Sequence, residues 1–317
     1  YPTALNKQAV VRQFKNLKPI DKTWRDAHAA IARSRSDWLI GMNLSRLYTG
    51  KLKNIGIIGN YAVGRSISTV LNLICQWEKS IEDFKEEPIY ELTGKTNING
   101  KEIDLKSTLR MVGEKNKTKF ISTLKAHGLT SKRVNGTVAL IDTIVKETFP
   151  PIMFTKGDLY KEMNRVAGWT QARSKNVMQK NYDDGYQTYP RTDAGEIPRH
   201  QYEYLKEGFD NYLHAIGLDG KFQRYEMPED KLKKYLVKES ADDAHYGIVP
   251  TEKIMGENDD VTDDQRLMYE VVVRKALTML IKPYQYVSNR LGIKANDIPM
   301  IAQNNAVLDP GWKAILM

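Results

Sequence analysis

A short segment near the middle of this 317-residue chain is kept out of helix and carries reactive side chains. Residues 185–195 read Gly-Tyr-Gln-Thr-Tyr-Pro-Arg-Thr-Asp-Ala-Gly. Proline fixes its own φ and disfavours a helical conformation at the residue before it, so we expect Tyr189 to be extended. Because residues i and i+2 of an extended segment face the same side, Tyr189 and Arg191 would point at one target.

This pair of side chains suits one kind of chemistry. A phenol that loses its proton can attack a phosphodiester and hold the phosphate covalently. An isolated phenol titrates near ~10, so it needs cationic help, and a guanidinium is always charged and binds phosphate through a planar fork. The chain has 17 tyrosines, and a single tyrosine is more often a packing residue with its hydroxyl at the surface. The surrounding residues decide between these interpretations.

Several segments, in the same order along almost the whole chain, resemble the motifs of type IA DNA topoisomerases. Tyr189-Pro190-Arg191-Thr192-Asp193 is similar to the family's active-site motif, and residues 178–185 to the helix before it. Residues 243–251, which include His245, resemble the motif His-x-Ala-Ile-x-Pro-Thr. The remaining matches are the Arg-rich helix at residues 32–46, Gly64-Arg65 with the apolar run to Phe84, and Pro310-Gly311-Trp312.

The resemblance implies a role for each matched residue. Tyr189 would be the nucleophile, while Arg191 and His245 would stabilise the negative charge that develops on the phosphate. The residues implied to bind DNA are Arg33, Arg35, Asp37, Arg46, Arg65, Thr192 and Asp193. The chain departs from the family pattern at Ala194, which replaces a serine, at Ser66-Ile67, which replaces Val-Gln, and at Gly247, which replaces an alanine. The change at residue 247 is small and should preserve access to the site.

The charge of the chain favours a nucleic-acid partner. Its net charge is +9, and residues 1–58 hold 11 Lys and Arg against 3 Asp and Glu, whereas the remaining residues hold 37 against 36. A basic stripe confined to one segment is the footprint expected of phosphate-backbone contact. The alternative for the scattered lysines is a solvated helical face. Trp38 would either stack on a base or be buried.

Composition predicts a soluble globular protein. The chain is 41% hydrophobic and 27% charged, and no apolar run approaches the ~18 residues that span a membrane. Cys75 is the only cysteine, which excludes an intrachain disulfide and favours the reducing cytoplasm. We expect Cys75 to be a small core residue. The chain starts at Tyr1 without an initiator Met, and we expect it to be a piece of a longer, monomeric polypeptide.

The expected fold is α+β and multidomain, as in the toroid of the family that the chain resembles. Residues 1–87 would form the first part of a helical base, and residues 88–150 the first part of a β-rich arch. Residues 151–275 would form the catalytic Tyr domain, with a helix-turn-helix, winged-helix-like arrangement. Residues 276–317 would return to the arch.

Local patterns predict the individual elements. Helical spacing of apolar residues predicts helices at residues 6–17, 23–49, 64–84, 156–167, 170–183, 199–215 and 262–281. Asn99-Gly100 between two alternating stretches predicts a hairpin, and Pro150-Pro151 predicts a hinge. Residues 284–317 are expected to be short strands, and residues 105–127 have no clear pattern.

No metal site is expected in this chain. In the resembled family, Mg²⁺ is held by a Glu and an Asp-x-Asp pair of an N-terminal Toprim domain, for which the chain has no counterpart. Asp259-Asp260 and Asp263-Asp264 are interpreted as a solvated turn and a helix N-terminus, with Thr262 or Asp263 as the N-cap. Residues 59–66 resemble a phosphate loop, but Arg65 replaces its lysine, which argues against nucleotide hydrolysis.

The sequence therefore predicts a fragment of a type IA DNA topoisomerase, which cleaves and rejoins single-stranded DNA through a 5′-phosphotyrosine without ATP. RNA as a side substrate stays open. The fragment would bind no cofactor and would be inactive in relaxation without the missing Toprim domain of the same polypeptide, which would hold Mg²⁺. Two alternatives are a non-catalytic single-stranded nucleic-acid-binding module on the same fold and a helix-turn-helix regulator.

Overall fold

The computed structural model describes residues 11, 14–15, 19–131, 133–237 and 245–316. The chain divides into two units. The first comprises Tyr1–Asn16, Leu92–Leu109 and His127–Met317, and the second comprises Leu17–Glu91 and Arg110–Ala126. The helix expected at residues 6–17 lies almost entirely outside the described residues, and the four predicted domain ranges stay a prediction.

The second unit contains the long helices α2 (Ile20–Asn54) and α3 (Arg65–Glu82), both where helices were predicted. Two hydroxyls of α2 hold the segment between these helices. The Val63 N–H donates to the Ser45 hydroxyl at 2.8 Å, and the Tyr61 N–H donates to the Thr49 hydroxyl at 3.1 Å. This attachment brings Gly64, the N-cap of α3, beside the middle of α2.

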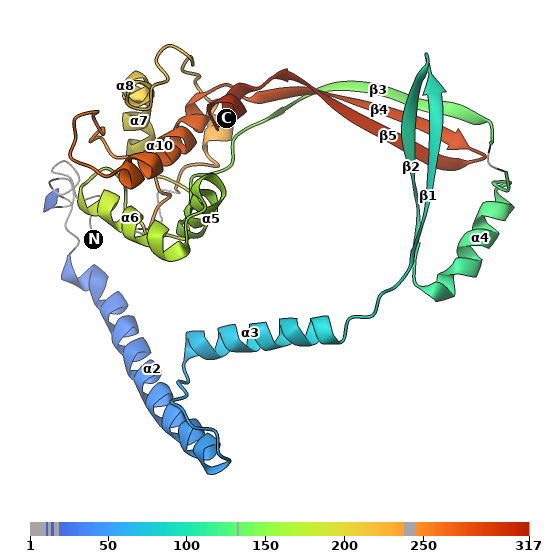
Figure 1. Ribbon diagram of the computed structural model, residues 1–317. Coiled ribbons are helices and arrows are strands. Elements are labelled where there is room, and N and C mark those ends of the chain that lie inside the picture. Colours follow the sequence, from blue (N-terminus) through green and yellow to red (C-terminus); the bar gives the residue numbers. More distant parts are fainter. Residues whose placement is uncertain (1–10, 12–13, 16–18, 132, 238–244, 317) are drawn as a thin grey trace. The chain divides into compact units, whose positions relative to one another are not determined.

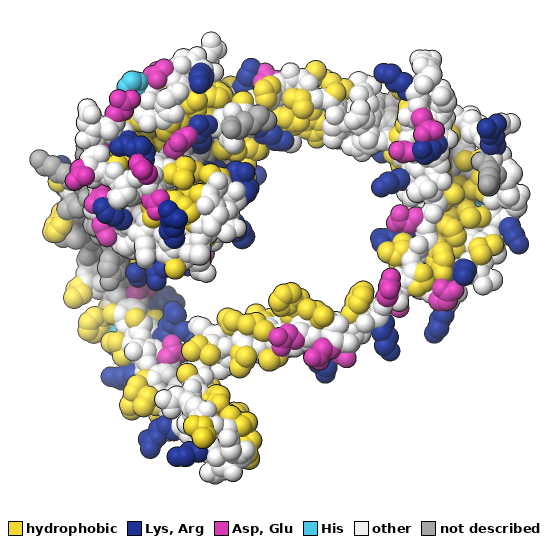
Figure 2. All heavy atoms as spheres, viewed as in Figure 1, with side chains coloured by type: hydrophobic (Ala, Val, Ile, Leu, Met, Phe, Trp, Pro, Cys, Tyr) yellow, Lys and Arg dark blue, Asp and Glu magenta, His cyan; other side chains and the backbone are white. Residues whose placement is uncertain are grey.

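The apolar side chains of α3 are exposed (Figure 2). Ile67, Val70, Ile74 and Trp77 recur at helical spacing and are between 46% and 67% exposed. Cys75 is exposed as well, so the expectation that it is a core residue was wrong. The physical reason is that no described segment of the chain covers this helix, although its sequence pattern is that of a buried one.

A five-stranded sheet has the order β1-β2-β5-β4-β3. β1 (Ile89–Ile98) and β2 (Lys101–Val112) are the arms of the predicted hairpin, and Asn99 and Gly100 form its turn with φ of 52° and 81°. β3 (Gly136–Thr148) pairs antiparallel with β4 (Tyr284–Ala295) along its whole length, and β4 pairs with β5 (Ile298–Asp309) (Figure 1).

Two expectations about these regions need correction. The tail forms two twelve-residue strands rather than short ones, because Asn296 and Asp297 make a single turn with positive φ. The middle of β5 consists of exposed polar residues, so the sequence does not show that the strand continues through them. The segment without a clear pattern contains the end of β2, the short helix η1 (Glu114–Asn116) and α4 (Lys117–Ala126).

Helices α5 (Lys156–Ala167) and α6 (Gln171–Asp183) confirm the predicted helix-turn-helix arrangement. The hydroxyls of Thr155 and Thr170 accept the backbone N–H groups of Asp158 and Arg173, each the third residue of its helix. Gly168 ends α5 in the left-handed conformation, with φ of 66°. These local signals explain why the predicted bounds agree with the structure.

The remaining helices cover the core of the first unit. The helix expected at residues 199–215 is split at Gly208 into α7 (Arg199–Glu207) and α8 (Phe209–Ala215). A short helix α9 (Glu229–Leu232) follows, and α10 (Asp263–Leu277) begins with a capping box of Thr262 and Gln265, as predicted for Thr262. The short helices η2 (Thr278–Leu280) and η3 (Gly311–Leu316) complete the unit. Fully buried side chains of this core include Leu159, Leu205, Phe209, Tyr212, Val273 and Leu277.

The chain leaves β3 through Pro150-Pro151, which was predicted to be a hinge. Three buried side chains bind the carbonyl groups around these prolines. Trp312 Nε1 donates to the Thr148 carbonyl at 2.8 Å, the Tyr235 hydroxyl donates to the Pro150 carbonyl, and Lys275 Nζ donates to the Pro151 carbonyl at 3.1 Å. These three hydrogen bonds therefore fix the segment that connects β3 to the helices of this unit.

In the part of the chain that the structure describes, no helix has both the length and the apolar character needed to cross a membrane.

Candidate active site

Backbone pairing brings two of the sequence motifs together. The Thr188 N–H donates to the Val249 carbonyl at 3.0 Å, and the Thr251 N–H donates to the Tyr186 carbonyl at 3.2 Å. Gln187 and Pro250 lie opposite each other in this antiparallel bridge. The segment that leads into Tyr189 is thus fixed beside the segment that follows His245, although the two are far apart in the sequence.

Tyr189 is half-buried between two rings. Its ring centroid lies 5.4 Å from that of Tyr182, edge-on at 74°, and 5.3 Å from that of His245, tilted at 47°. Burial raises the pKa of Tyr182, and the nearby Tyr189 and Asp183 act in the same direction. The structure therefore brings together Tyr189 and His245, two of the three predicted catalytic residues, with His245 on the exposed side.

Arg191 does not join this pair. The side chain is exposed, and among the described residues no hydrogen bond, ion pair or ring contact joins it to Tyr189. Its charge instead acts on Tyr160 of α5: burial raises the pKa of Tyr160, and Arg191 opposes that rise. The pairing beside Tyr189 is a single bridge between Gln187 and Pro250, and Pro190 has no N–H with which to extend it.

The two residues after Arg191 order the turn that follows. Thr192 is 1% exposed, its hydroxyl accepts the Ala194 N–H at 3.1 Å, and its carbonyl accepts the Lys156 N–H at 2.9 Å. The carboxylate of Asp193 is exposed and lies 3.8 Å from Lys156 Nζ. A DNA contact by Thr192 would require this turn to open, and the DNA-binding roles of both residues stay predictions.

Two glycines allow three segments of backbone to meet behind the site. The Met153 N–H donates to the Gly195 carbonyl at 3.0 Å, and the Gly247 N–H donates to the Glu196 carbonyl at 2.7 Å. A Cβ on Gly247 would lie 2.7 Å from the Gly195 oxygen and 2.8 Å from Met153 Cβ. At residue 247 the backbone therefore lies too close to Gly195 and Met153 for the alanine that the family has there.

Gly247→Ala is expected to lower the free energy of unfolding by about 1–2 kcal/mol, because the new methyl group meets backbone atoms that have little room to move. Urea unfolding of the two chains measures this difference. Gly157→Ala is the matched control, since its nearest atom would be 3.9 Å away and alanine favours the helix in which it lies. Equal stability of Gly247→Ala and the unchanged chain would contradict the expected clash.

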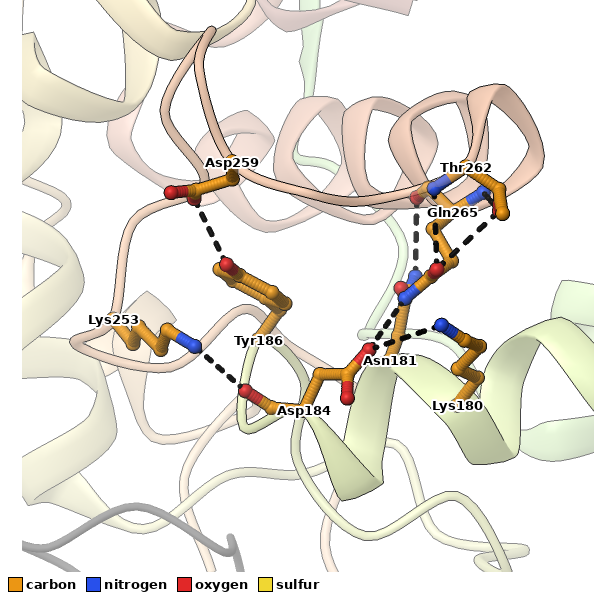
Figure 3. A network of polar contacts seen from close by, with 8 residues as sticks. All are labelled: Lys180, Asn181, Asp184, Tyr186, Lys253, Asp259, Thr262 and Gln265. Atoms are coloured by element: carbon orange, nitrogen blue, oxygen red, sulfur yellow. Dashed lines mark hydrogen bonds and ion pairs between the residues drawn. The ribbon is translucent and has the colours of Figure 1, made fainter.

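A polar network holds the turn between α6 and Tyr189 (Figure 3). The Asp184 carboxylate accepts a hydrogen bond from Gln265 Nε2 at 2.8 Å, and its carbonyl accepts one from Lys253 Nζ at 2.9 Å. The Lys253 ammonium also lies 4.0 Å from the centroid of the Tyr186 ring. The Tyr186 hydroxyl donates to Asp259 at 2.8 Å, and burial together with this carboxylate raises the pKa of Tyr186 to about 12.

Sequence reasoning did not find this network, because its members come from three separate segments and form no motif. Asp259 lies in a turn, as predicted, and its carboxylate also accepts the Gly256 N–H at 2.8 Å, but the side chain is half-buried against Tyr186 rather than solvated. Asp263 lies in the first turn of α10, as expected of an acidic residue at a helix N-terminus.

The predicted DNA-binding residues of α2 divide between two faces of the helix. Arg33, Asp37 and Arg65 line a cleft of about 530 Å³, and Arg65 Nη2 lies 3.1 Å from the Asp37 carboxylate. With 3.6 residues per turn, Arg35 and Arg46 are rotated by about 200° and about 220° from Arg33. Of these arginines, only Arg33 and Arg65 line the cleft, and the DNA-binding roles of all four stay predictions. Trp38 is 67% exposed rather than buried.

The described residues contain no group of three or more His, Cys, Asp or Glu side chains that could hold a metal ion. Two acidic residues of this polar network are bonded to protein groups: Asp184 to Gln265, and Asp259 to Tyr186. The described acidic residues of this site do not form a Mg²⁺ site.

Comparison with known proteins agrees with the motifs. The family model described as DNA topoisomerase matches residues 21–317, which include Tyr189 and His245. This chain belongs to the type IA DNA topoisomerase family. The topoisomerase chain is 27% identical over 321 residues to DNA topoisomerase 3 of Bacillus cereus, and 23% identical over 315 residues to DNA topoisomerase 3 of Staphylococcus aureus.

These alignments cover 99% of the chain but only 41% and 42% of the two relatives, so the chain spans less than half the length of the curated topoisomerases it matches. The full-length topoisomerase I structure from Thermotoga maritima is similar in fold, with a TM-score of 0.64 and 20% identity. That alignment covers 99% of this chain and 49% of the Thermotoga chain. The α+β fold predicted for a type IA topoisomerase is thus confirmed.

Proposed function

We propose that this chain supplies the nucleophile of a type IA DNA topoisomerase, which cleaves and rejoins single-stranded DNA. The observation that carries the proposal is the contact between the rings of Tyr189 and His245, with 5.3 Å between their centroids. Family membership and the motif around Tyr189 support it. The single cysteine favours a reducing compartment, and we place the protein in the cytoplasm.

In this reaction the Tyr189 oxygen attacks a phosphorus of the DNA backbone. The bond from that phosphorus to the 3′ oxygen breaks, the phenolic proton ends on the released 3′-hydroxyl, and the phosphate stays on Tyr189 as a 5′-phosphotyrosine. His245 would donate a hydrogen bond to the phosphate, and the exposed Arg191 would turn toward it once DNA is bound. The reverse attack by the 3′-hydroxyl restores the DNA, so no ATP is consumed.

The cleft on α2 would contribute DNA binding in its own unit. Arg33 and Arg65 line it together with Gly64, whose position at the N-terminus of α3 adds backbone N–H groups that favour an anion. The ion pair of Arg65 with Asp37 is exposed and therefore weak enough for a phosphate to compete with it.

Covalent capture tests the proposal. The complete gene product is mixed with a single-stranded oligonucleotide labelled at its 3′ end and quenched with denaturant. The label is expected to remain on the protein, and peptide mapping is expected to place it on the peptide that contains Tyr189. A parallel 5′ label is expected on a released fragment, because the protein takes the 5′-phosphate.

Other outcomes support the alternatives. Retention of single-stranded DNA without any adduct would favour a non-catalytic binding module, and protection of one specific duplex would favour a helix-turn-helix regulator. Transfer of the 5′ label to the protein, or an adduct at another residue, would contradict the assignment of Tyr189.

A further inference from the structure

The residue before the nucleophile makes an unusual connection to the His245 segment. In an antiparallel ladder, every second pair of opposed residues exchanges two N–H···O=C bonds. Thr188 and Val249 are opposed in this way, and the Thr188 N–H donates to the Val249 carbonyl at 3.0 Å. The return bond is different: the Val249 N–H donates to the Thr188 hydroxyl, also at 3.0 Å.

The same hydroxyl is used twice. It donates to the Gly247 carbonyl at 3.3 Å, so both its donor and its acceptor capacity serve the segment that follows His245. Thr188 is 3% exposed, and water does not compete with these bonds. At the other end of the pairing, the Thr251 hydroxyl donates to the Gly185 carbonyl and accepts the Lys253 N–H at 3.1 Å.

The Val249 N–H thus binds the Thr188 side chain instead of the Thr188 carbonyl, and the backbone pairing ends at Thr188. The next residue of the opposite segment, Ile248, turns away and donates its N–H to the Phe154 carbonyl at 2.9 Å. The peptide between Thr188 and Tyr189 is therefore outside the ladder. Tyr189 leaves the pairing at this point, with its ring between those of Tyr182 and His245.

We propose that Thr188 is a positioning residue for the cleavage reaction: its hydroxyl ends the pairing one residue before Tyr189 and so sets the phenol beside His245. This inference rests on the proposed function of Tyr189. Because Thr188 is 3% exposed, its role would be to place its neighbour rather than to touch the DNA.

The test compares two substitutions in the complete gene product. Thr188→Val keeps the branched shape and removes the hydroxyl, whereas Thr188→Ser keeps the hydroxyl. We expect Thr188→Val to form the covalent adduct with single-stranded DNA roughly tenfold more slowly in a single turnover, because a small misplacement of a reacting group is costly. The dissociation constant for the DNA is expected to stay within twofold, and Thr188→Ser is expected to react within twofold of the original rate.

Thr278→Val is the matched control. Thr278 is equally buried, and its hydroxyl donates to the Lys275 carbonyl at 2.6 Å at the end of α10, away from the paired segments. Its rate is expected to be unchanged below the melting temperature. An unchanged rate in Thr188→Val, or an equal loss in Thr278→Val, overturns the inference.

Two further results keep the inference separate from folding and from the proposed function. If Thr188→Val does not fold, the rate of Thr188→Ser tests the inference instead. A serine variant that forms the adduct slowly overturns it, because the hydroxyl is still present. If Tyr189→Phe still forms an adduct, the proposed function itself fails. If Tyr189→Phe forms none while Thr188→Val reacts normally, only the positioning role is wrong.

Discussion

Tyr189→Phe is expected to abolish covalent capture of single-stranded DNA by the complete gene product. The substitution removes one oxygen and keeps the ring that contacts Tyr182 and His245. Because the nucleophile itself is lost, we expect the rate of adduct formation to fall by at least about 10⁴-fold. Denaturing gels of the quenched reaction, with DNA labelled at its 3′ end, measure the adduct directly.

Tyr182→Phe provides the control for that experiment. Tyr182 is buried and its ring meets that of Tyr189 edge-on, so this variant tests a phenol that is in contact with the proposed nucleophile. This variant is expected to keep its adduct. Capture that survives in Tyr189→Phe but disappears in Tyr182→Phe would move the nucleophile to α6 and would refute the proposed mechanism.

The second large effect is an unusual dependence of stability on pH, caused by Lys275. This side chain is 6% exposed, and burial lowers its pKa to about 8, although Asp158 and Glu162 oppose the change. These carboxylates raise the pKa of Lys275 less than burial lowers it. Each already has a partner: Asp158 accepts a hydrogen bond from Thr155, and Glu162 accepts one from Arg165.

The sign of the effect follows from proton binding. An unfolded lysine has a pKa near ~10.4, so between pH 8 and pH 10 the unfolded chain holds a proton that the folded chain has released. The free energy of unfolding therefore rises with pH in this window. Relative to Lys275→Met, the original chain is expected to gain about 2 kcal/mol between pH 7 and pH 9.5.

Urea unfolding of both chains at the two pH values measures this gain. Comparison with Lys275→Met cancels the buried tyrosines, such as Tyr235 with a pKa raised by burial to about 12, whose effect has the opposite sign and begins near pH 10. Lys161→Met is the control, because Lys161 also faces Asp158 but is exposed to solvent. A pH dependence shared by Lys275→Met and the original chain would show that Lys275 is not the cause.

Lys275 lies where the sheet joins the helices of the first unit, and its ammonium group binds the backbone there. Its ammonium group, the Tyr235 hydroxyl and the Trp312 indole bind three carbonyl groups around Pro150-Pro151, where β3 joins the helical part of the first unit. An apolar side chain at residue 275 would leave the Pro151 carbonyl without this donor.

Much of the local structure could be predicted from short stretches of sequence. The bounds of α5 and α6 follow from Thr155, Gly168 and Thr170, whose capping and left-handed preferences act within one helical turn. The hairpin at Asn99-Gly100 follows from the positive φ that its turn requires. The family resemblance of their motifs also predicts that Tyr189 and His245 share one site, and their rings are in contact.

Contacts between distant segments could not be derived in this way. The contacts that join the segments of Tyr189 and His245 include the Thr188 hydroxyl and the close backbone approach at Gly247, and neither forms a pattern that can be recognised in the sequence. The apolar pattern of α3 likewise predicted burial that no described segment provides. Capping and turn energies are set by neighbours within a few residues, so sequence reports them well. Which backbone groups remain free to pair, and which faces are covered, is settled only when remote parts of the chain pack together.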